Sequence, residues 1–435
     1  MRKILTLAVM AMASMSVFAQ SGTNSPYSQY GLGELSDRSG GFNRGMNGLS
    51  YGLRKHNQIN AQNPASYSAI DSLSFIFDAG VGLQLTNFTE NGYKKNAQNA
   101  DIEYVIGGFR ACKHVGIGFG VLPFTNVGYN YQNTHRVNDA SSTETANTTY
   151  TNTYDGEGGL HEVFLGVGVE PIRNFSLGVN ASYLWGGYTR TILNSYSDTY
   201  VNTLSRKYSV DVRSYDLTFG LQWTAPLSKK DMVTLGLTYG LGHSLNADPE
   251  CLMISTNSQT GVADTAKFVI ENVLDMPHRF GAGLAYNHNN KLTVGFDYQL
   301  QQWGKLAFPQ YQTTNGVSSY VMQNGVLKDR QKFTLGFEYC KDERYHGFFS
   351  RLHYRGGVSY ATPYYTVNGQ DGPKEISASL GLGIPIINNY NNRSILNISA
   401  QWVNFQAPGM LKENTFRINV GLTFNERWFA KFKVE

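Results

Sequence analysis

The chain contains 435 residues, of which 41% are hydrophobic, 13% aromatic and 16% charged, and its formal net charge is +4. A charge this small gives no reason to expect a nucleic-acid partner, and three cysteines, Cys112, Cys251 and Cys340, are too few for a disulfide framework. We therefore expect three free thiols and, because no Pro-rich or Ser-rich linker divides the chain, one large architecture instead of several soluble domains.

The N-terminus has the pattern of a secretory signal peptide. Arg2 and Lys3 precede an apolar run from Ile4 to about Phe18, and small residues stand where a signal peptidase cleaves, near Ala19. The apolar run is shorter than the roughly 20 residues of a membrane-spanning helix, which makes a retained helix the weaker alternative. We expect residues 1–19 to be removed during export.

The next stretch, residues 20–71, has no clean strand period. It contains Asn24 to Gly31, Gly40 to Gly48 and Asn60 to Ser66, and it is rich in Gly, Tyr, Phe and Met. A disordered tail would carry more charge and fewer of these residues. We expect an irregular plug, or hatch, inside a lumen where side chains and water satisfy its backbone polar groups.

From about Leu73 onward, apolar and polar residues alternate with period two, which predicts strands with one apolar face. The clearest strand places Phe416, Ile418, Val420, Leu422 and Phe424 on one side and Arg417, Asn419, Gly421 and Thr423 on the other. Some fourteen such strands are predicted, at about Leu73–Phe88, Asp101–Arg110, His114–Tyr131, His161–Val169, Phe175–Thr191, Tyr208–Thr224, Met232–Leu245, His278–Tyr286, Lys291–Trp303, Gln331–Tyr339, Phe348–Tyr365, Lys374–Ile386, Ser394–Asn404 and Thr415–Phe429. In a secreted chain this pattern predicts an all-β fold, a transmembrane antiparallel β-barrel of about 14 strands over residues 72–435.

The connections between these strands are alternately short and long. The long group includes Gln132 to Leu160, Asn246 to Pro277 and Gly304 to Arg330, which are rich in Asn, Thr and Ser. Outer-membrane barrels have short periplasmic turns and long outer loops. We therefore expect a bacterial outer-membrane location with both termini in the periplasm.

The third predicted strand, His114–Tyr131, contains a proline at its centre. Pro123 has no N–H to donate to a strand ladder, and Gly120 and Gly128 flank it. A closed barrel has no edge on which to tolerate proline, so this position predicts a bulge or kink. A simple adjustment of strand twist is the alternative.

Six charged residues fall on the polar faces of the predicted strands: Asp216, Asp297, Lys332, Glu338, Arg355 and Arg417. Several would lie on neighbouring strands, where charges of opposite sign can pair. We interpret them as ion pairs in the lumen that hold the plug or brace the wall, in preference to a direct role in substrate binding.

No catalytic, metal or cofactor site is predicted. His135, His161 and His278 lie near predicted loops, but no nucleophile and carboxylate are marked as their partners, and no HExxH or CxxC spacing occurs. Gly116, Gly118 and Gly120 lie inside an alternating strand and open no helix, so they do not form a nucleotide loop.

Several short segments, in this order and spacing, resemble the FadL-type outer-membrane transporters of hydrophobic compounds, in the form common in Bacteroidetes. The resemblance covers essentially the whole mature chain. It rests on Gly45 to Leu49, Asn60 to Ser66, Gly156 to Gly159, Ser176 to Asn180, Tyr183 to Gly186, Met276 to Leu284, Gly295 to Tyr298 and Trp303. The closing Asn425 to Phe429 resembles the Bacteroidetes version and departs from the common terminal Phe.

The resemblance implies a monomeric barrel that carries a hydrophobic small molecule, by default a long-chain fatty acid, from outside to the outer-membrane lipid by facilitated diffusion. The ligand would leave sideways through a gap at a kink in the third strand, which is where Pro123 lies. In the hatch, Phe42, Met46 and Leu49 are the candidate ligand contacts. The motif residues Asn63, Pro64 and Ala65 are expected to fix the connection of the hatch to the first strand.

Two other functions remain open. Related barrels resemble a component of a protein secretion system, in which barrel and loops bind partner proteins, and an enzymatic barrel is a third possibility. An apolar pocket beneath the long loops would favour transport. A solidly packed lumen with an exposed loop face would favour partner binding.

Overall fold

The computed structural model describes residues 22–90, 92–136, 148–342, 347–387 and 393–427. Within these residues the chain is nearly all sheet. The predicted signal peptide, residues 1–19, and the closing residues from Trp428 lie outside the described part of the chain.

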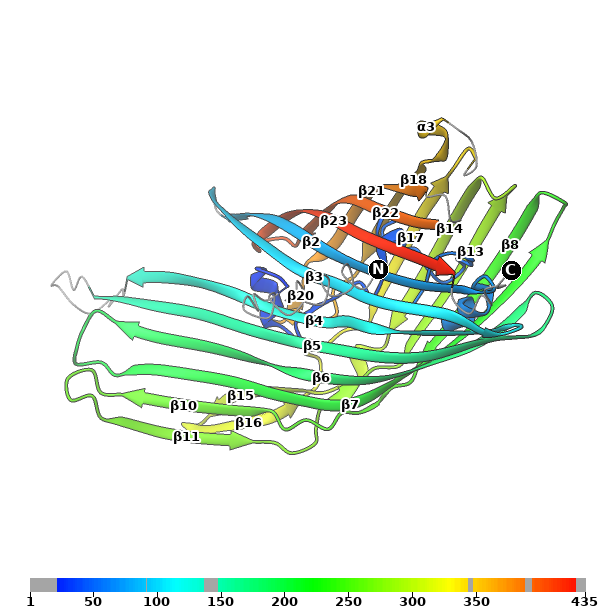
Figure 1. Ribbon diagram of the computed structural model, residues 1–435. Helices are drawn as coiled ribbons and strands as arrows, with labels where there is room; N and C mark the ends of the chain where they lie inside the picture. The colour runs from blue at the N-terminus through cyan, green and yellow to red at the C-terminus, as the bar shows by residue number, and fades with distance from the viewer. Residues whose placement is uncertain (1–21, 91, 137–147, 343–346, 388–392, 428–435) are drawn as a thin grey trace, which may run out of the picture.

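Fourteen strands of the described chain form a closed antiparallel barrel (Figure 1). They are β2 (Ser74–Glu90), β3 (Tyr93–Cys112), β4 (Val115–Arg136), β5 (Thr149–Ile172), β6 (Phe175–Tyr196), β7 (Thr203–Pro226), β8 (Asp231–Gly240), β13 (Arg279–His288), β14 (Leu292–Gln301), β17 (Arg330–Tyr339), β18 (His353–Ala361), β21 (Lys374–Ile387), β22 (Arg393–Gln406) and β23 (Lys412–Arg427). The barrel closes between β2 and β23, where Phe77 lies opposite Phe424. The predicted all-β barrel of about 14 strands is confirmed.

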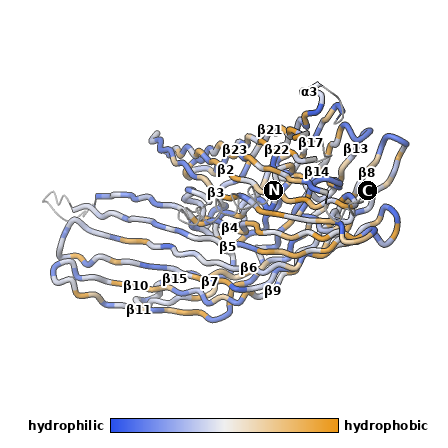
Figure 2. The backbone as a smooth tube through the Cα atoms, viewed as in Figure 1, coloured by the Kyte–Doolittle hydropathy of each residue, from blue (hydrophilic) through white to orange (hydrophobic). Residues whose placement is uncertain are grey.

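The alternation along each strand separates an apolar outside from a polar inside. On β14, Phe296 is 47% exposed, whereas the next residue, Asp297, is 4% exposed. Large apolar side chains stand exposed on many outer faces, among them Val81, Leu165, Leu237, Leu335, Leu380 and Trp402. Figure 2 shows hydrophobic residues along the barrel strands and hydrophilic ones at the tip of the β2–β3 hairpin. An apolar exterior around a polar interior is the pattern of a barrel that spans a membrane.

No helix in the described residues is long and apolar enough to cross a membrane.

Strand length differs around the barrel and creates a projection on one side. β5 and β7 have 24 residues and β6 has 22, whereas β8, β13 and β14 have 10 each. A tilted strand crosses a bilayer with about 9 to 11 residues. The parts of β4 to β7 nearest the long connections, which we call their upper parts, therefore project beyond the barrel, as Figure 1 shows on its left side.

Two predicted long loops contain further strands. The stretch Asn246 to Pro277 forms β10 (Glu250–Thr256) and β11 (Ala263–Val269), which add to the upper half of β7. The stretch Gly304 to Arg330 forms β15 (Phe308–Thr314) and β16 (Val317–Gln323), a separate two-stranded sheet. We call the upper halves of β4 to β7, together with β10 and β11, the extension. Its strands lack a lipid-facing side and so lack the alternation that reveals the barrel strands.

One strand begins later than predicted, and several short elements were not predicted. The predicted strand from Phe348 begins only at His353, because Phe348–Arg351 form the short helix α3. β9 (His243–Ser244) pairs with β12 (Asp275–Met276), β19 (Thr366–Val367) pairs with β20 (Gln370–Asp371), and η4 spans Trp303–Lys305. Cys112 is exposed, Cys251 and Cys340 are buried, and no disulfide joins them.

Residues 22–72 lie inside the barrel, against its inner wall. They form η2 (Pro26–Gln29), β1 (Glu34–Leu35), α2 (Gly41–Arg44) and η3 (Pro64–Ala69), joined by turns. Glycines of the wall allow their backbone to come close: a Cβ on Gly236 would lie 1.8 Å from the Tyr51 carbonyl oxygen, and one on Gly116 would lie 1.9 Å from that of Tyr67. The inner wall of the barrel is therefore complementary in shape to residues 22–72.

Replacing Gly236 with Ala should lower the free energy of unfolding by about 1 to 3 kcal/mol, because the added methyl group overpacks the contact with Tyr51. The measurement is the temperature at which the folded band of the barrel disappears in SDS electrophoresis. Thr265→Ala, at an exposed position of β11, is the control and should leave this temperature unchanged. Equal temperatures for all three proteins would contradict close packing at Gly236.

Candidate functional site

The wall of the barrel is split between β3 and β4. The ladder between these strands ends at Val105 and Val121. Beyond that pair, β3 continues to Tyr93 bonded to β2 alone, and β4 continues to Arg136 along β5. Figure 1 shows the two strands diverging toward the end with the long connections.

The split begins at the proline singled out in the sequence. Gly120 lies in the last rungs of the β3–β4 ladder, where a Cβ would stand 2.5 Å from the Val105 carbonyl oxygen. Two residues after Val121, the pairing of β4 with β5 shifts register between Pro123 and Thr125. This shift is a β-bulge of the kind expected where proline interrupts a ladder.

The N-terminal segment fills the split. β1 pairs with the free edge of β4, with Glu34 opposite Asn126 and Leu35 opposite Thr125. The Ser36 N–H donates to the Phe124 carbonyl at 3.0 Å, and the Gly128 N–H donates to the Ser28 hydroxyl at 3.1 Å. On the other side, the Asn24 amide donates to the Gln98 carbonyl of β3 at 3.0 Å. The unpaired backbone of both strands is thus partly satisfied by polar groups of this segment.

Ion pairs fasten the segment to the wall at every charged residue from Glu34 to Arg38. Glu34 pairs with Arg417 at 2.7 Å, and Asp37 pairs with Lys332 at 2.7 Å. Arg38 forms a bidentate ion pair with Glu162, with N–O distances of 2.5 and 2.6 Å, and one of its terminal nitrogens lies 3.4 Å from Asp216. Arg279 pairs with the other oxygen of Asp216 at 2.5 Å. Burial alone would raise the pKa of Asp37, but the Lys332 ammonium outweighs it and holds the pKa well below its usual range.

An open cavity of about 720 Å³ lies between the two diverging strands, next to the contacts of the N-terminal segment with β4 and toward the end with the long connections. Its floor includes Pro26, Tyr27 and Tyr30 of the N-terminal segment. Its sides include Phe88, Tyr131, Val367, Met410 and Leu411, with Lys94, Lys95 and several Asn at the rim. The Tyr27 hydroxyl donates to the Leu411 carbonyl, and burial first, then Glu413, raises its pKa, so Tyr27 stays a neutral donor. The cavity therefore combines aromatic and apolar walls with polar residues that include Gln29 and Glu90.

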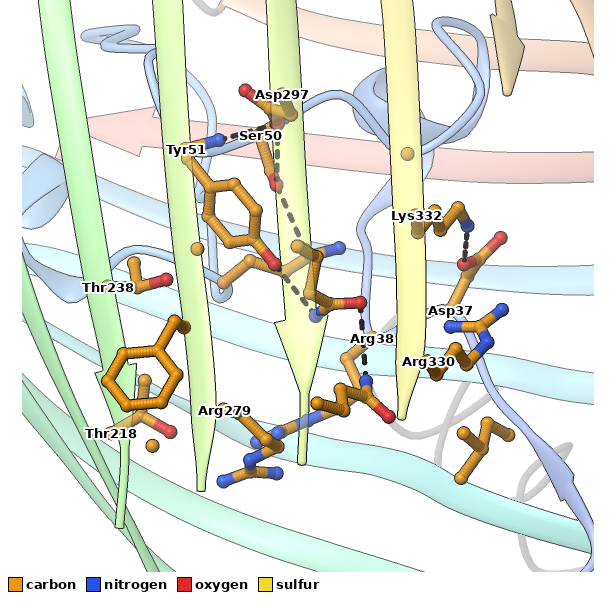
Figure 3. A pocket seen from close by; sticks show the side chains of 18 of the residues that line it. Asp37, Arg38, Ser50, Tyr51, Thr218, Thr238, Arg279, Asp297, Arg330 and Lys332 are labelled. Atoms are coloured by element: carbon orange, nitrogen blue, oxygen red, sulfur yellow. Dashed lines mark hydrogen bonds and ion pairs between the residues drawn. The ribbon is translucent and has the colours of Figure 1, made fainter. Parts of the chain in front are cut away.

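Two much smaller cavities lie deeper inside the barrel. A cavity of about 100 Å³ lies between the N-terminal segment and β8, β13, β14 and β17, and one of about 50 Å³ lies beside it. Figure 3 shows the first cavity, with Arg38 and Arg279 close together and Lys332 facing Asp37. A third cavity, of about 580 Å³, opens at the end with the short turns and contains Arg54, Lys55 and His56.

The predicted lumen charges mostly hold the N-terminal segment. Lys332 and Arg417 pair with it as described, and Asp297 accepts the N–H groups of Ser50 at 2.6 Å and Tyr51 at 2.9 Å. Glu338 pairs with Arg355 on the neighbouring strand at 2.6 Å and with Lys55 of the segment at 2.6 Å. That these residues hold the plug or brace the wall stays a prediction.

The remaining predicted residues belong to the packing of the N-terminal segment. Phe42, Met46 and Leu49 form a buried cluster with Leu53 and Ala285, and none of the three lines any of the four cavities described above. Asn63 caps η3 by accepting the Ala65 N–H at 3.2 Å, and its amide donates to the Tyr51 carbonyl at 2.8 Å. Pro64 and Ala65 form the first turn of η3, which leads into β2.

Sequence reasoning missed Glu34, Asp37, Arg38 and Glu162. Their signal was the charged run Glu34 to Arg38 inside an otherwise uncharged stretch, and Glu162 on a strand with apolar neighbours. In the described residues no three His, Cys, Asp or Glu side chains lie close enough to hold a metal ion.

Three comparisons place the chain among known proteins. A family model described as BamG matches residues 1–435, and no curated protein matches. Among solved structures, the toluene transporter TodX of P. putida is 14% identical with a TM-score of 0.62, over 91% of this chain and 100% of that one. The toluene transporter TbuX of Ralstonia pickettii is 14% identical with a TM-score of 0.61, over 90% and 99%. A FadL homologue of Pseudomonas aeruginosa is 13% identical with a TM-score of 0.59, over 90% and 98%. Likeness at this level of identity shows a shared fold, that of FadL-type channels.

Proposed function

The chain belongs to the BamG family, and for this member we propose an outer-membrane channel that passes small hydrophobic molecules sideways through the split between β3 and β4. Solved proteins with this fold are described as toluene transporters and as a monoaromatic hydrocarbon channel, which supports the proposal. In this arrangement the short turns and both termini face the periplasm, and the extension faces the outside.

The observation that carries the proposal is the end of the β3–β4 ladder at Val105 and Val121. In a membrane barrel each unpaired backbone group within the bilayer costs several kcal/mol, so a wall is normally bonded all the way round. Val121 is 42% exposed on the outer face and Ile102 of β3 is 40% exposed, so the split starts within the apolar band of the exterior. An opening at this level leads from the barrel toward lipid.

The ligand class follows from the cavity above the split. Its aromatic and apolar walls and its volume of about 720 Å³ suit a small hydrophobic molecule or one end of a longer chain. Such a molecule gains about 25 cal/mol for each Å² of apolar surface kept out of water. A long-chain fatty acid remains the default substrate, since Lys94 and Lys95 line this cavity against the single carboxylate of Glu90.

A sideways exit is favoured because the straight route is narrow and charged. The inner cavities of about 100 and 50 Å³ are bordered by Arg38, Arg279, Arg330 and Lys332, and an apolar molecule would have to displace their polar partners. Lateral passage requires only that β1 and its flanking residues leave the edge of β4. The body of the segment, held against wall glycines, can stay in place.

The proposed activity is tested by uptake of radiolabelled oleate and toluene in a host that lacks its own transporters for them. We expect uptake above the empty-vector level for at least one of the two. A folded, surface-exposed barrel with no uptake of either compound would contradict transport.

Replacing Pro123 with Val should slow uptake several-fold, because a residue with an N–H allows β4 to pair more completely and narrows the split. Initial uptake rates at matched protein levels give the measurement. Pro385→Val, at a proline inside the β21 ladder far from the split, is the control and should leave the rate unchanged. An unchanged rate for Pro123→Val would show that the bulge is only structural.

A second candidate is a non-transport barrel that binds partner proteins in a secretion system. The small, charged inner cavities and the wide extension favour it. Absence of uptake from a correctly inserted protein, together with retention of a defined partner that is lost when β10 and β11 are deleted, would select this function over transport.

A further inference from the structure

A buried arginine, Arg190, and a partly buried one, Arg206, lie on the inner face of the extension, and neither has a carboxylate partner in the described residues. Arg190 on β6 lies opposite Tyr208 of β7, and Arg206 of β7 lies opposite Ile192, so the two arginines are diagonal neighbours on one face of the sheet. Both belong to the part of the chain beyond the lipid-facing band. Among the ion pairs within 4.0 Å in the described residues, none involves either arginine.

Arg190 is surrounded by aromatic rings. It is 8% exposed, and its guanidinium carbon lies 4.0 Å from the centre of the Tyr188 ring. One terminal nitrogen donates to the Gly31 carbonyl at 2.7 Å, while the buried Nε has no hydrogen-bond partner. A buried guanidinium normally pairs with an anion, because its charge is costly to remove from water.

Arg206 is partly buried and also lies near an aromatic ring. Its guanidinium carbon lies 5.5 Å from the centre of the Tyr311 ring, and its Nε is also buried without a hydrogen-bond partner. Ring faces stabilise a cation by about 0.5 to 2 kcal/mol, which is less than the cost of burying an uncompensated charge. Two such neighbours leave the site with a local charge of plus two.

The β15–β16 hairpin covers this site from the other side. Tyr320 of β16 lies 6.1 Å from the Tyr208 ring, centre to centre, and Tyr311 of β15 lies 6.4 Å from Phe268. The hairpin forms its own two-stranded sheet, and these two ring contacts join it to the extension. Burial raises the pKa of Tyr320, so its hydroxyl stays protonated and can donate a hydrogen bond.

We propose that Arg190, Arg206 and the hydroxyls of Tyr208 and Tyr320 form a binding site for a phosphate-type oxyanion, closed by the β15–β16 hairpin. Arg206 and the Tyr208 hydroxyl already share a hydrogen bond, and the further donors are the Nε groups of both arginines and the Tyr320 hydroxyl of the hairpin. Donors on several sides suit a tetrahedral anion better than a planar carboxylate, and arginine is the preferred residue for phosphate oxygens. The anion supplies the negative charge that the described residues around the arginines lack.

The test uses the full-length barrel purified in a neutral detergent. Isothermal titration with inorganic phosphate, at an ionic strength held constant with chloride, should show saturable binding. Arg190→Gln and Arg206→Gln should each weaken binding at least tenfold, and Arg213→Gln, an exposed arginine of β7 on the other face, should not. Tyr320→Phe keeps the ring and removes one hydroxyl, so it should fold normally and weaken binding several-fold.

A second titration with phosphatidic acid in mixed micelles separates the two sources of such an anion. Tighter binding than for inorganic phosphate assigns the site to a lipid headgroup, and weaker binding assigns it to a free phosphate. Absence of binding for both probes, or equal binding by the wild type and the Arg190→Gln/Arg206→Gln double variant, would overturn the proposal. Because these titrations do not depend on passage through the split, they test the anion site separately from the uptake experiments.

Discussion

A disulfide between cysteines introduced by Leu35→Cys and Thr125→Cys should reduce uptake of a hydrophobic probe more than tenfold. These residues are directly opposite on β1 and β4, and the neighbouring Ser36–Phe124 pair is the hydrogen-bonded one. Leu35 and Thr125 therefore form a non-hydrogen-bonded pair with Cα atoms about 4.5 Å apart, close enough for a disulfide. The bond would hold β1 in the split and close the proposed exit. Initial uptake rates before and after oxidation measure the effect.

The native thiols are removed first, by Cys112→Ser, Cys251→Ala and Cys340→Ala, so that only the new pair can oxidise. A matched control joins Thr134→Cys and Thr151→Cys on β4 and β5, whose hydroxyl oxygens lie 3.0 Å apart and away from the N-terminal segment. Uptake should survive oxidation of the control and return in the test protein after reduction. Normal uptake through the oxidised Leu35–Thr125 link would rule out passage by displacement of β1.

Replacing Arg38 with Ala should lower the free energy of unfolding by about 3 to 5 kcal/mol, the cost of leaving one member of a buried ion pair alone. Glu162 and Asp216 both have fully buried side chains, and Arg38 is the closest cation to Glu162. Asp216 keeps Arg279, so most of the loss should come from Glu162. Urea unfolding in lipid vesicles, followed by tryptophan fluorescence, measures the change.

The double variant Arg38→Ala/Glu162→Gln should recover a large part of the loss, because a neutral amide is less costly to bury alone than a carboxylate. Arg213→Ala, which removes an exposed arginine, should have almost no effect. If the double variant were as unstable as Arg38→Ala, the loss would have to come from the cation–π contact of Arg38 with Phe124 or from packing.

The barrel was predictable because lipid on one side and a polar lumen on the other impose the same two-residue period on every strand. Phe416 to Phe424 shows this most clearly, and β23 covers that stretch. The extension was not predictable in this way. Tyr150 to Tyr154 and Ile254 to Thr256 lie in stretches rich in Thr, Ser and Asn, so their strands were expected to be loops.

The candidate site was predictable only in part. Pro123 predicted an irregularity in this strand, where the pairing with β5 shifts register, because its missing N–H is a local property of one residue. The ion pairs that seal the split join residues more than a hundred positions apart, such as Arg38 and Glu162, and no local pattern relates them. Phe42, Met46 and Leu49 were chosen for their apolar character, which suits a packed core as well as a ligand pocket.

The glycine-lined contact between residues 22–72 and the wall restricts the order in which the protein can assemble. The segment precedes β2, touches strands as far along the chain as β23, and is enclosed once β2 joins β23. A space shaped so closely to its contents cannot be filled afterwards through the mouth of the barrel. The strands must wrap around the segment, and the β2–β23 seam, whose partners are farthest apart in the chain, should be the last to form.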